Sequence, residues 1–171
     1  IVTTTGYASL DYLAWGSFAA AFFFILTFVG GCTGSTAGGL KIFRFQMAAR
    51  IVSRHLGHAV HPHAVVPLRY AGRLVTDEQV GSVAVFVFVY LATVIVATVA
   101  LAALGLDPET ALSGAATAVG NVGPGIGPVI GPAGNFSTLP DAAKLILPAA
   151  MVMGRLEIIS VLLLLSPSFY R

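Results

Sequence analysis

Three long apolar runs, separated by polar or glycine-rich segments, dominate the pattern along the chain. The first extends from Leu13 to Val29 without a charged residue, the second from about residue 80 to 104, and the third from about residue 142 to 165. A helix needs roughly 20 apolar residues to cross the hydrocarbon core of a bilayer. The second run has no soluble alternative other than a buried core helix. The pattern therefore predicts an all-α membrane protein with three spans.

A shorter apolar segment lies between the second and third runs. Asp107, Pro108 and Glu109 form a helix start signal, with an N-cap residue, a proline at the first helical position and an acid in the first turn. The apolar residues at 110–119 are too few to span a bilayer, so they predict a re-entrant half helix. The glycine-rich loop at 120–125 follows it, and irregular backbone at this depth must be buried in protein or line a watery cavity. Span, short helix, loop and span together make the unit from which potassium-channel filters are built.

The composition supports a membrane location. Hydrophobic residues make up 57% of the chain and charged residues 9%, with a mean hydropathy of +0.90, whereas about 25% of the residues in a soluble domain are charged. We therefore expect membrane lipid around much of the surface, and no nucleic acid as a partner. The chain begins at Ile1, inside a motif described below, and we expect it to be a fragment of a longer protein. The single cysteine, Cys32, excludes an internal disulfide, and we expect it to be a small buried residue.

The charges between the runs predict the orientation of the spans. Basic residues outnumber acids between the first and second runs, whereas acids dominate between the second and third. The positive-inside rule therefore places residues 41–78 in the cytoplasm, 105–141 outside, and the C-terminal Arg171 inside again. The basic residues between the first two runs form either a simple cytoplasmic flank or a contact with lipid head groups or a cytosolic partner. They are Lys41, Arg44, Arg50, Arg54, Arg69 and Arg73. No metal site is expected from the nearby histidines, which lack i,i+4 spacing with a carboxylate: His55, His58, His61 and His63.

Two short loops, each preceding a span of the same orientation, have the residues of an ion filter. Gly6 and Gly123 would take the positive φ that a loop with inward-facing carbonyls requires, because glycine enters left-handed backbone freely. In potassium channels such carbonyls replace the hydration shell of the ion. Taken singly, the first loop also fits a threonine-rich turn and the second a flexible Gly/Pro turn, but the pair favours a filter. The candidates are Thr3, Thr4, Thr5, Gly6 and Tyr7, and Gly120, Asn121, Val122, Gly123 and Pro124.

A decapeptide that contains five glycines follows the first run directly. Each glycine disfavours a helix by about 1 kcal/mol relative to alanine, so a continuous helix is not expected here. The segment lacks the lysine of a phosphate loop and the spacing of a nucleophile elbow. Small-residue helix packing through Gly30, Gly34 and Gly38 is one alternative, and a movable plug beneath the filter is the other. The residues of this candidate gate are Gly30, Gly31, Cys32, Thr33, Gly34, Ser35, Thr36, Ala37, Gly38 and Gly39.

Arg155 lies inside the third run, where a charge indicates function and needs a partner. On a continuous helix it would lie past the bilayer midplane, about 21 Å from Asp141. Glu157 is excluded as its partner on that helix, because residues two apart point to opposite faces. We expect Arg155 to donate hydrogen bonds to carbonyl or hydroxyl oxygens of residues 30–39. The alternative is a purely structural hydrogen bond between helices.

Five motifs together resemble one family. The segments TTTGY, FVGGCTGSTAGGLKIFRF, HPHAVVPLRYAGRLV, NVGPGIG and MGRLEIISVLLLLSPSFYR occur in this order and are spread from one end of the chain to the other. They resemble the C-terminal part of the TrkH family, the membrane subunits of potassium uptake systems in the Trk/Ktr/HKT superfamily. The resemblance implies M1–P–M2 repeats, four around one pore, of which this chain would hold the end of the third and all of the fourth. It divides the chain into a filter loop and broken M2 helix at 1–56, a cytoplasmic connector at 57–78, and the fourth repeat at 79–171.

The resemblance also implies the ligands and partners. Residues 30–39 would form the intramembrane gating loop, and Arg155 would contact it. Pro124 stands where the first loop has Tyr7, so the symmetry of the filter would be approximate. The implied partners are repeats one and two of the same protein, a second copy in a homodimer, and a cytosolic TrkA-type nucleotide-binding ring. No organic cofactor is implied, only a potassium ion bound by the backbone carbonyls of Thr4, Thr5, Gly6, Asn121, Val122 and Gly123.

The function expected from the sequence is potassium uptake through a filter in the cell inner membrane, not catalysis. The gate would be the glycine-rich loop, with residues 41–78 and the C-terminus in the cytoplasm. Without repeats one and two the chain alone would not conduct. One alternative is a proton- or sodium-coupled symporter in which Glu157 or another buried acid carries protons. A second alternative is a non-conducting membrane assembly subunit.

Overall fold

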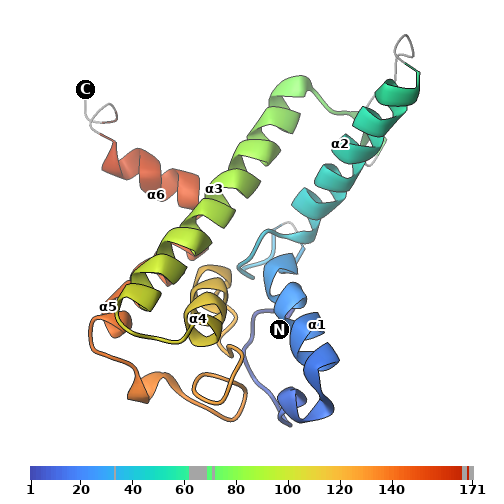
Figure 1. The fold of residues 1–171 in the computed structure, drawn as a ribbon. Coiled ribbons are helices and arrows are strands. Elements are labelled where there is room, and N and C mark those ends of the chain that lie inside the picture. Colours follow the sequence, from blue (N-terminus) through green and yellow to red (C-terminus); the bar gives the residue numbers. More distant parts are fainter. Residues whose placement is uncertain (33, 62–68, 71, 167–168, 170–171) are drawn as a thin grey trace.

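The structure, a computed structural model, is helical apart from one pair of two-residue strands (Figure 1). It describes residues 1–32, 34–61, 69–70, 72–166 and 169. Thr33, His63 and Arg171, which the sequence analysis names, lie outside the described residues. The elements are η1 (Tyr12–Trp15), α1 (Ser17–Val29), α2 (Ile42–Val60), β1 (Arg69–Tyr70), β2 (Arg73–Leu74), α3 (Asp77–Ala103), α4 (Pro108–Gly120), η2 (Phe136–Thr138), α5 (Ala143–Arg155) and α6 (Ile158–Leu165).

The longest helix, α3, corresponds to the second apolar run. Its N-terminus has a capping box, in which Thr76 Oγ1 accepts a hydrogen bond from the Gln79 N–H (3.4 Å) and Gln79 Oε1 accepts one from the Thr76 N–H (3.2 Å). Asp77 and Glu78 add negative charge to the first turn, where its interaction with the helix dipole stabilises the helix. Among the described residues, α3 is the one helix that is long and apolar enough to cross a bilayer by itself. The helix predicted at 80–104 is thus confirmed.

The first apolar run, which starts at Leu13, is not helical throughout in one continuous segment. A 3-10 turn comes first, and Gly16 follows it with a φ of 101°. This angle lies outside the helical region, so helical hydrogen bonding has to restart after it. Helix α1 therefore begins only at Ser17 and ends at Val29, where Gly30 has a φ of 66°. The glycine-rich segment begins where the sequence predicts it.

Helix α4 is the predicted half helix, and most of it is buried. Asp107 caps its N-terminus by accepting a hydrogen bond from the Thr110 N–H (2.9 Å), and Pro108 takes the first helical position. All residues from Ser113 to Gly120 are buried, and nearly all of them are small. Small side chains let helix backbones approach closely, and α4 packs between α3, α5 and α1 (Figure 1). The core of the described chain is built around this helix.

The third apolar run is split into two helices that meet at an angle of 105°. Helix α5 ends at Arg155, α6 begins at Ile158, and Glu157 between them has a φ of 58°. The third run is therefore not one straight helix, although Arg155 lies, as predicted, on the helix that follows Asp141. A straight helix would direct Arg155 and Glu157 to opposite faces. The break instead lets both side chains reach the segment that follows α1, as described below.

The connector between α2 and α3 holds the one departure from the all-α prediction among the described residues. Strand β1 pairs with β2 in antiparallel register, with Arg69 opposite Leu74 and Tyr70 opposite Arg73. Strands of two residues cannot form a stable sheet alone. Helix α2 continues to Val60, so it passes through the division predicted between residues 56 and 57. The helical fold class is otherwise as predicted.

Candidate functional site

The two predicted filter loops share one order of backbone handedness. In the first loop Thr4 and Gly6 have φ values of 52° and 78°, and in the second Asn121 and Gly123 have values of 53° and 113°. In each loop the residue between these two does not have positive φ. Positive φ is uncommon outside glycine, and for a β-branched residue such as threonine it is an outlier. The same alternation therefore occurs twice, at matching positions of the two motifs.

The two loops lie in direct backbone contact. A Cβ atom built on Gly6 would lie 2.6 Å from the carbonyl oxygen of Val122, and one built on Gly123 would lie 3.5 Å from the Cα atom of Gly6. A separation below 3.0 Å is not compatible with a real side chain at Gly6. The contact thus requires glycine at position 6 for space as well as for φ.

Helix α4 and its neighbours hold the second loop in place. The Thr117 carbonyl accepts a hydrogen bond from the Val122 N–H (2.9 Å), and the Thr117 hydroxyl accepts one from the Gly123 N–H (2.9 Å). Further along the chain, the buried Tyr12 hydroxyl donates to the carbonyl of Gly125 (3.2 Å). The bonds to Thr117 use the N–H groups of the loop as donors, so they do not occupy the carbonyls of residues 121–123.

The limits of the second loop differ by one residue from the prediction. Gly120 is the last residue of α4 rather than part of the loop, and its assignment to the filter stays a prediction. The left-handed residue that ends the helix is Asn121, with a φ of 53° and a ψ of 40°. Asparagine is an accepted alternative to glycine at this position. Its side-chain amide also donates to the carbonyl of Met151 in α5 (3.0 Å).

The remaining residues of the first loop are placed less tightly. Thr3 and Thr5 share a hydrogen bond between their hydroxyl groups (3.0 Å). Tyr7 is 92% exposed in this chain. Neither observation assigns a ligand, so the roles of these residues stay predictions.

The glycine-rich segment folds as a closed loop between α1 and α2. The Leu40 N–H donates to the carbonyl of Phe28 (3.1 Å), and the Ile42 N–H donates to that of Gly31 (3.0 Å). A Cβ atom on Gly30 would lie 2.4 Å from the Gly38 carbonyl oxygen, so glycine is required at the neck of the loop. Among its described residues none is helical, which confirms that the helix is interrupted. The exposed Cys32 does not fit the prediction of a buried residue, because it lies on the open part of the loop.

The same loop touches both predicted filter loops or their supports. The Gly38 N–H donates to the Thr4 hydroxyl (3.3 Å). A Cβ atom on Gly38 would lie 2.2 Å from the carbonyl oxygen of Gly120 at the end of α4. Residues 37–40 are buried in these contacts. The loop therefore lies against the first predicted filter loop and against the helix end that precedes the second.

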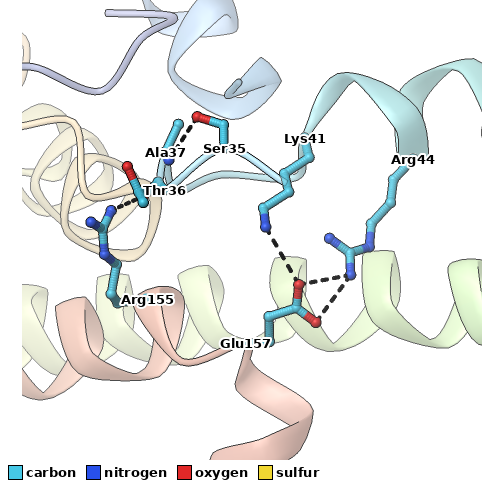
Figure 2. A network of polar contacts seen from close by, with 7 residues as sticks. All are labelled: Ser35, Thr36, Ala37, Lys41, Arg44, Arg155 and Glu157. Carbon is cyan, nitrogen blue, oxygen red and sulfur yellow. Dashed lines mark hydrogen bonds and ion pairs between the residues drawn. The ribbon is translucent and has the colours of Figure 1, made fainter. Parts of the chain in front are cut away.

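Arg155 donates a hydrogen bond from its Nη1 atom to the Thr36 carbonyl, at the tip of the loop (Figure 2). The predicted contact between Arg155 and residues 30–39 is confirmed. Its side chain is exposed in this chain, so the bond is not shielded from water here. Gly154 precedes it, and a Cβ atom there would lie 1.9 Å from the carbonyl oxygen of Val119. Close packing of α5 on α4 thus places Arg155 beneath the loops.

Glu157 binds two cations at the other end of the loop. Its carboxylate lies 3.6 Å from Lys41 Nζ and 3.3 Å from Arg44 Nη2 (Figure 2). The Arg44 guanidinium also lies 3.6 Å from the centre of the Phe86 ring of α3. The Glu157 side chain is 48% exposed, so it is not the buried acid that the symporter alternative requires.

Sequence reasoning misses several residues of this site. It puts Glu157 on a straight helix, whereas only the break brings this residue to the basic side chains. The close approach of Gly154 to α4 cannot be predicted from the sequence, which shows only a glycine before Arg155. No three His, Cys, Asp or Glu side chains converge as metal ligands in the part of the chain that the structure describes.

Comparisons with known proteins agree with this architecture. A crystal structure of the potassium transporter TrkH from Vibrio parahaemolyticus superposes with a TM-score of 0.90 at 34% identity, over 99% of this chain and 36% of that one. The fold is thus that of a helical membrane transporter. The sequence model of the TrkH cation transport proteins matches residues 1–169. The chain belongs to the TrkH family of cation transport proteins.

Individual relatives are transporters with related names. The chain is 56% identical over all its 171 residues to the Trk system potassium uptake protein TrkI of Halomonas elongata. It is 36% identical to the TrkH protein of Vibrio parahaemolyticus and 34% identical to that of Escherichia coli, again over all 171 residues. The chain spans 35% of the length of each of these relatives.

Proposed function

We propose that this chain contributes two filter loops and a gate to a pathway for potassium uptake. Residues 3–7 and 121–124 would line the filter, with potassium bound by backbone carbonyls as its hydration shell is removed. The carbonyls we assign are those of Thr4, Thr5, Gly6, Asn121, Val122 and Gly123. The relatives named potassium uptake proteins support the choice of ion.

The observation that carries the proposal is the repeated alternation of φ in two touching loops. Alternating handedness turns successive carbonyls in one direction, which a row of ion sites requires. Positive φ at a threonine is strained, and such strain is found mainly at functional sites. Two unrelated turns would have no reason to share this order and to pack backbone to backbone.

The proposed gate is the loop at 30–39. It contacts Thr4 of the first filter loop and the end of α4, and Arg155 binds its tip. A segment without helical hydrogen bonds can move at a lower free-energy cost than a helix. Release of the loop from Arg155 would open the pathway.

The proposed surroundings follow from the family. We propose a multi-pass protein of the inner membrane, with residues 41–78 in the cytoplasm. Two further repeats of the same protein would complete the pathway, and its partners would be a second copy in a homodimer and a cytosolic nucleotide-binding ring of the TrkA type. The M1–P–M2 division of the chain belongs to the same proposal.

Gly6→Ser in the full-length protein tests the filter. A side chain at this position would face the Val122 carbonyl at 2.6 Å, and left-handed backbone costs a non-glycine residue about 1–2 kcal/mol. We expect the ratio of potassium to sodium flux into reconstituted vesicles to fall severalfold. The control is Gly105→Ser, because Gly105 has a φ of 87° and an added Cβ atom there would meet no atom within 4 Å. Unchanged selectivity in Gly6→Ser would contradict the filter assignment.

A further inference from the structure

The break between α5 and α6 contacts the candidate gate at two separate points. Arg155, the last residue of α5, binds the tip of the loop at Thr36. Glu157, two residues later, binds Lys41 and Arg44, where the loop leads into α2. Figure 2 shows both contacts extending from the same turn of the chain. The gating mechanism proposed above uses only the contact between Arg155 and Thr36.

The backbone is strained at both ends of the second contact. Lys41 has a φ of 60° with a ψ of 139°, and Glu157 has a φ of 58° with a ψ of 112°. These angles lie outside the left-handed helical region that side chains other than glycine sometimes adopt. Strain of this kind persists only where surrounding contacts hold it. Lys41 directly precedes α2 and Glu157 directly precedes α6, so the ion pair joins the points at which these two helices start.

The environment of the two cations favours a defined geometry. The side chains of Lys41 and Arg44 are 21% and 16% exposed, whereas that of Glu157 is 48% exposed. The Arg44 guanidinium packs on the Phe86 ring, which fixes its orientation on α3. An isolated exposed ion pair contributes little. Here one carboxylate is shared by two partly buried cations, one of which is held by a ring.

We propose that Glu157 is a second positioning residue of the gate. It fixes the point where the loop leaves toward α2, while Arg155 fixes the tip. The loop is then held at both ends in the closed state, and movement of the α5–α6 break relative to α2 would release both contacts together. This inference rests on the proposed gating function, and it assigns Glu157 to regulation instead of proton transfer.

The test is potassium flux through the full-length protein in vesicles, without a cytosolic partner. Glu157→Gln keeps the shape of the side chain and removes its charge. We expect basal flux to rise about two- to fivefold, the range of a partly exposed ion pair, with the potassium-to-sodium ratio unchanged. The matched control is Asp141→Asn, since Asp141 forms an exposed pair with Lys144 (3.2 Å) outside the site. That variant should leave basal flux at the wild-type level.

Exchanging the charges of Glu157 and Arg44 distinguishes the effect of their pairing from a general structural effect of substitution. Glu157→Arg would place three positive charges together, and we expect a larger rise in basal flux than for Glu157→Gln. Adding Arg44→Glu restores an opposite-charge pair and should return the flux toward wild type. If the exchange does not lower the flux, the pairing is not what holds the loop, and the proposal is overturned.

Arg155→Ala distinguishes this inference from the gating function itself. If Arg155→Ala raises basal flux and Glu157→Gln does not, Glu157 has no role in the gate and the second contact is only structural. If neither variant raises flux, the gating function fails together with the inference. A rise in both, with rescue by the exchange, supports the two-point attachment.

Discussion

At the scale of single residues, the glycines of this chain act mainly through the space that they leave open. Gly154 is the extreme case, since a Cβ atom there would lie 1.9 Å from the Val119 carbonyl oxygen and 3.1 Å from the side-chain amide of Asn121. The sequence shows this residue only as a glycine in an apolar helix. Arg155 was predictable, because a charge among apolar residues needs a partner. The glycine that brings Arg155 to its partner was not predictable, because close packing depends on a neighbour distant in sequence.

Gly154→Ala should therefore destabilise the protein strongly. The added methyl group meets backbone, which cannot move aside as a flexible side chain can. We expect overpacking to lower the free energy of unfolding by about 1–3 kcal/mol, which would be measured as a lower thermal midpoint in detergent. Gly81→Ala in α3 is the matched control, because nothing lies within 4 Å of its Cβ position. Alanine is the better helix former, so this control should be neutral or slightly stabilising.

At the scale of elements, a helix start marked by a capping residue is more predictable than a break that depends on a distant contact. The start of α4 follows from three adjacent residues, and its N-cap and proline lie where the sequence places them. The sequence pattern puts the end of α4 one residue early, because glycine is the commoner left-handed residue and here asparagine takes that position. The bend after α5 is not predictable in the same way. It depends on Glu157 pairing with α2, a contact that local pattern does not contain.

The N-cap of α4 should make stability depend on pH. The backbone N–H of Thr110 holds the pKa of Asp107 below its ordinary value of 3.8. A carboxyl with a lowered pKa in the folded state stabilises the protein above its unfolded pKa and loses this effect as the pH falls through its folded value. We expect the thermal midpoint to drop as the pH falls below 3.8. In Asp107→Asn, which keeps a capping side chain without a charge, this part of the drop should vanish; an identical pH profile would contradict the assignment.

At the scale of the whole molecule, the sequence shows two similar loops but not their contact. Each loop is recognisable from glycine next to small polar residues. Their backbone contact depends on α4 being buried between α1, α3 and α5, and no local pattern reports that packing. The order of motifs along the chain indicates the family, whereas the path of the broken helices requires the structure.

The predicted orientation can be measured by thiol labelling of the full-length protein. Cys32 is exposed and has to be replaced first. In that background we expect a cysteine at Ser53, on α2, to react with an impermeant reagent only from the cytoplasmic side, because basic residues surround it. A cysteine at Ser137, an exposed position between α4 and α5, should react only from the opposite side. Labelling of both positions from one side would overturn the topology.

The central claim is that the loop at 30–39 closes the pathway and that Arg155 holds it there. The most direct measurement is basal potassium flux through Arg155→Ala in reconstituted vesicles without a cytosolic partner. Loss of one charge-assisted hydrogen bond at an exposed site disfavours the closed state by about 1 kcal/mol, which corresponds to a roughly fivefold shift toward the open state. The account predicts a rise in flux of this size, and a rise at least as large when residues 34–38 are deleted. Flux at the wild-type level in both variants, in protein that still assembles, would contradict it.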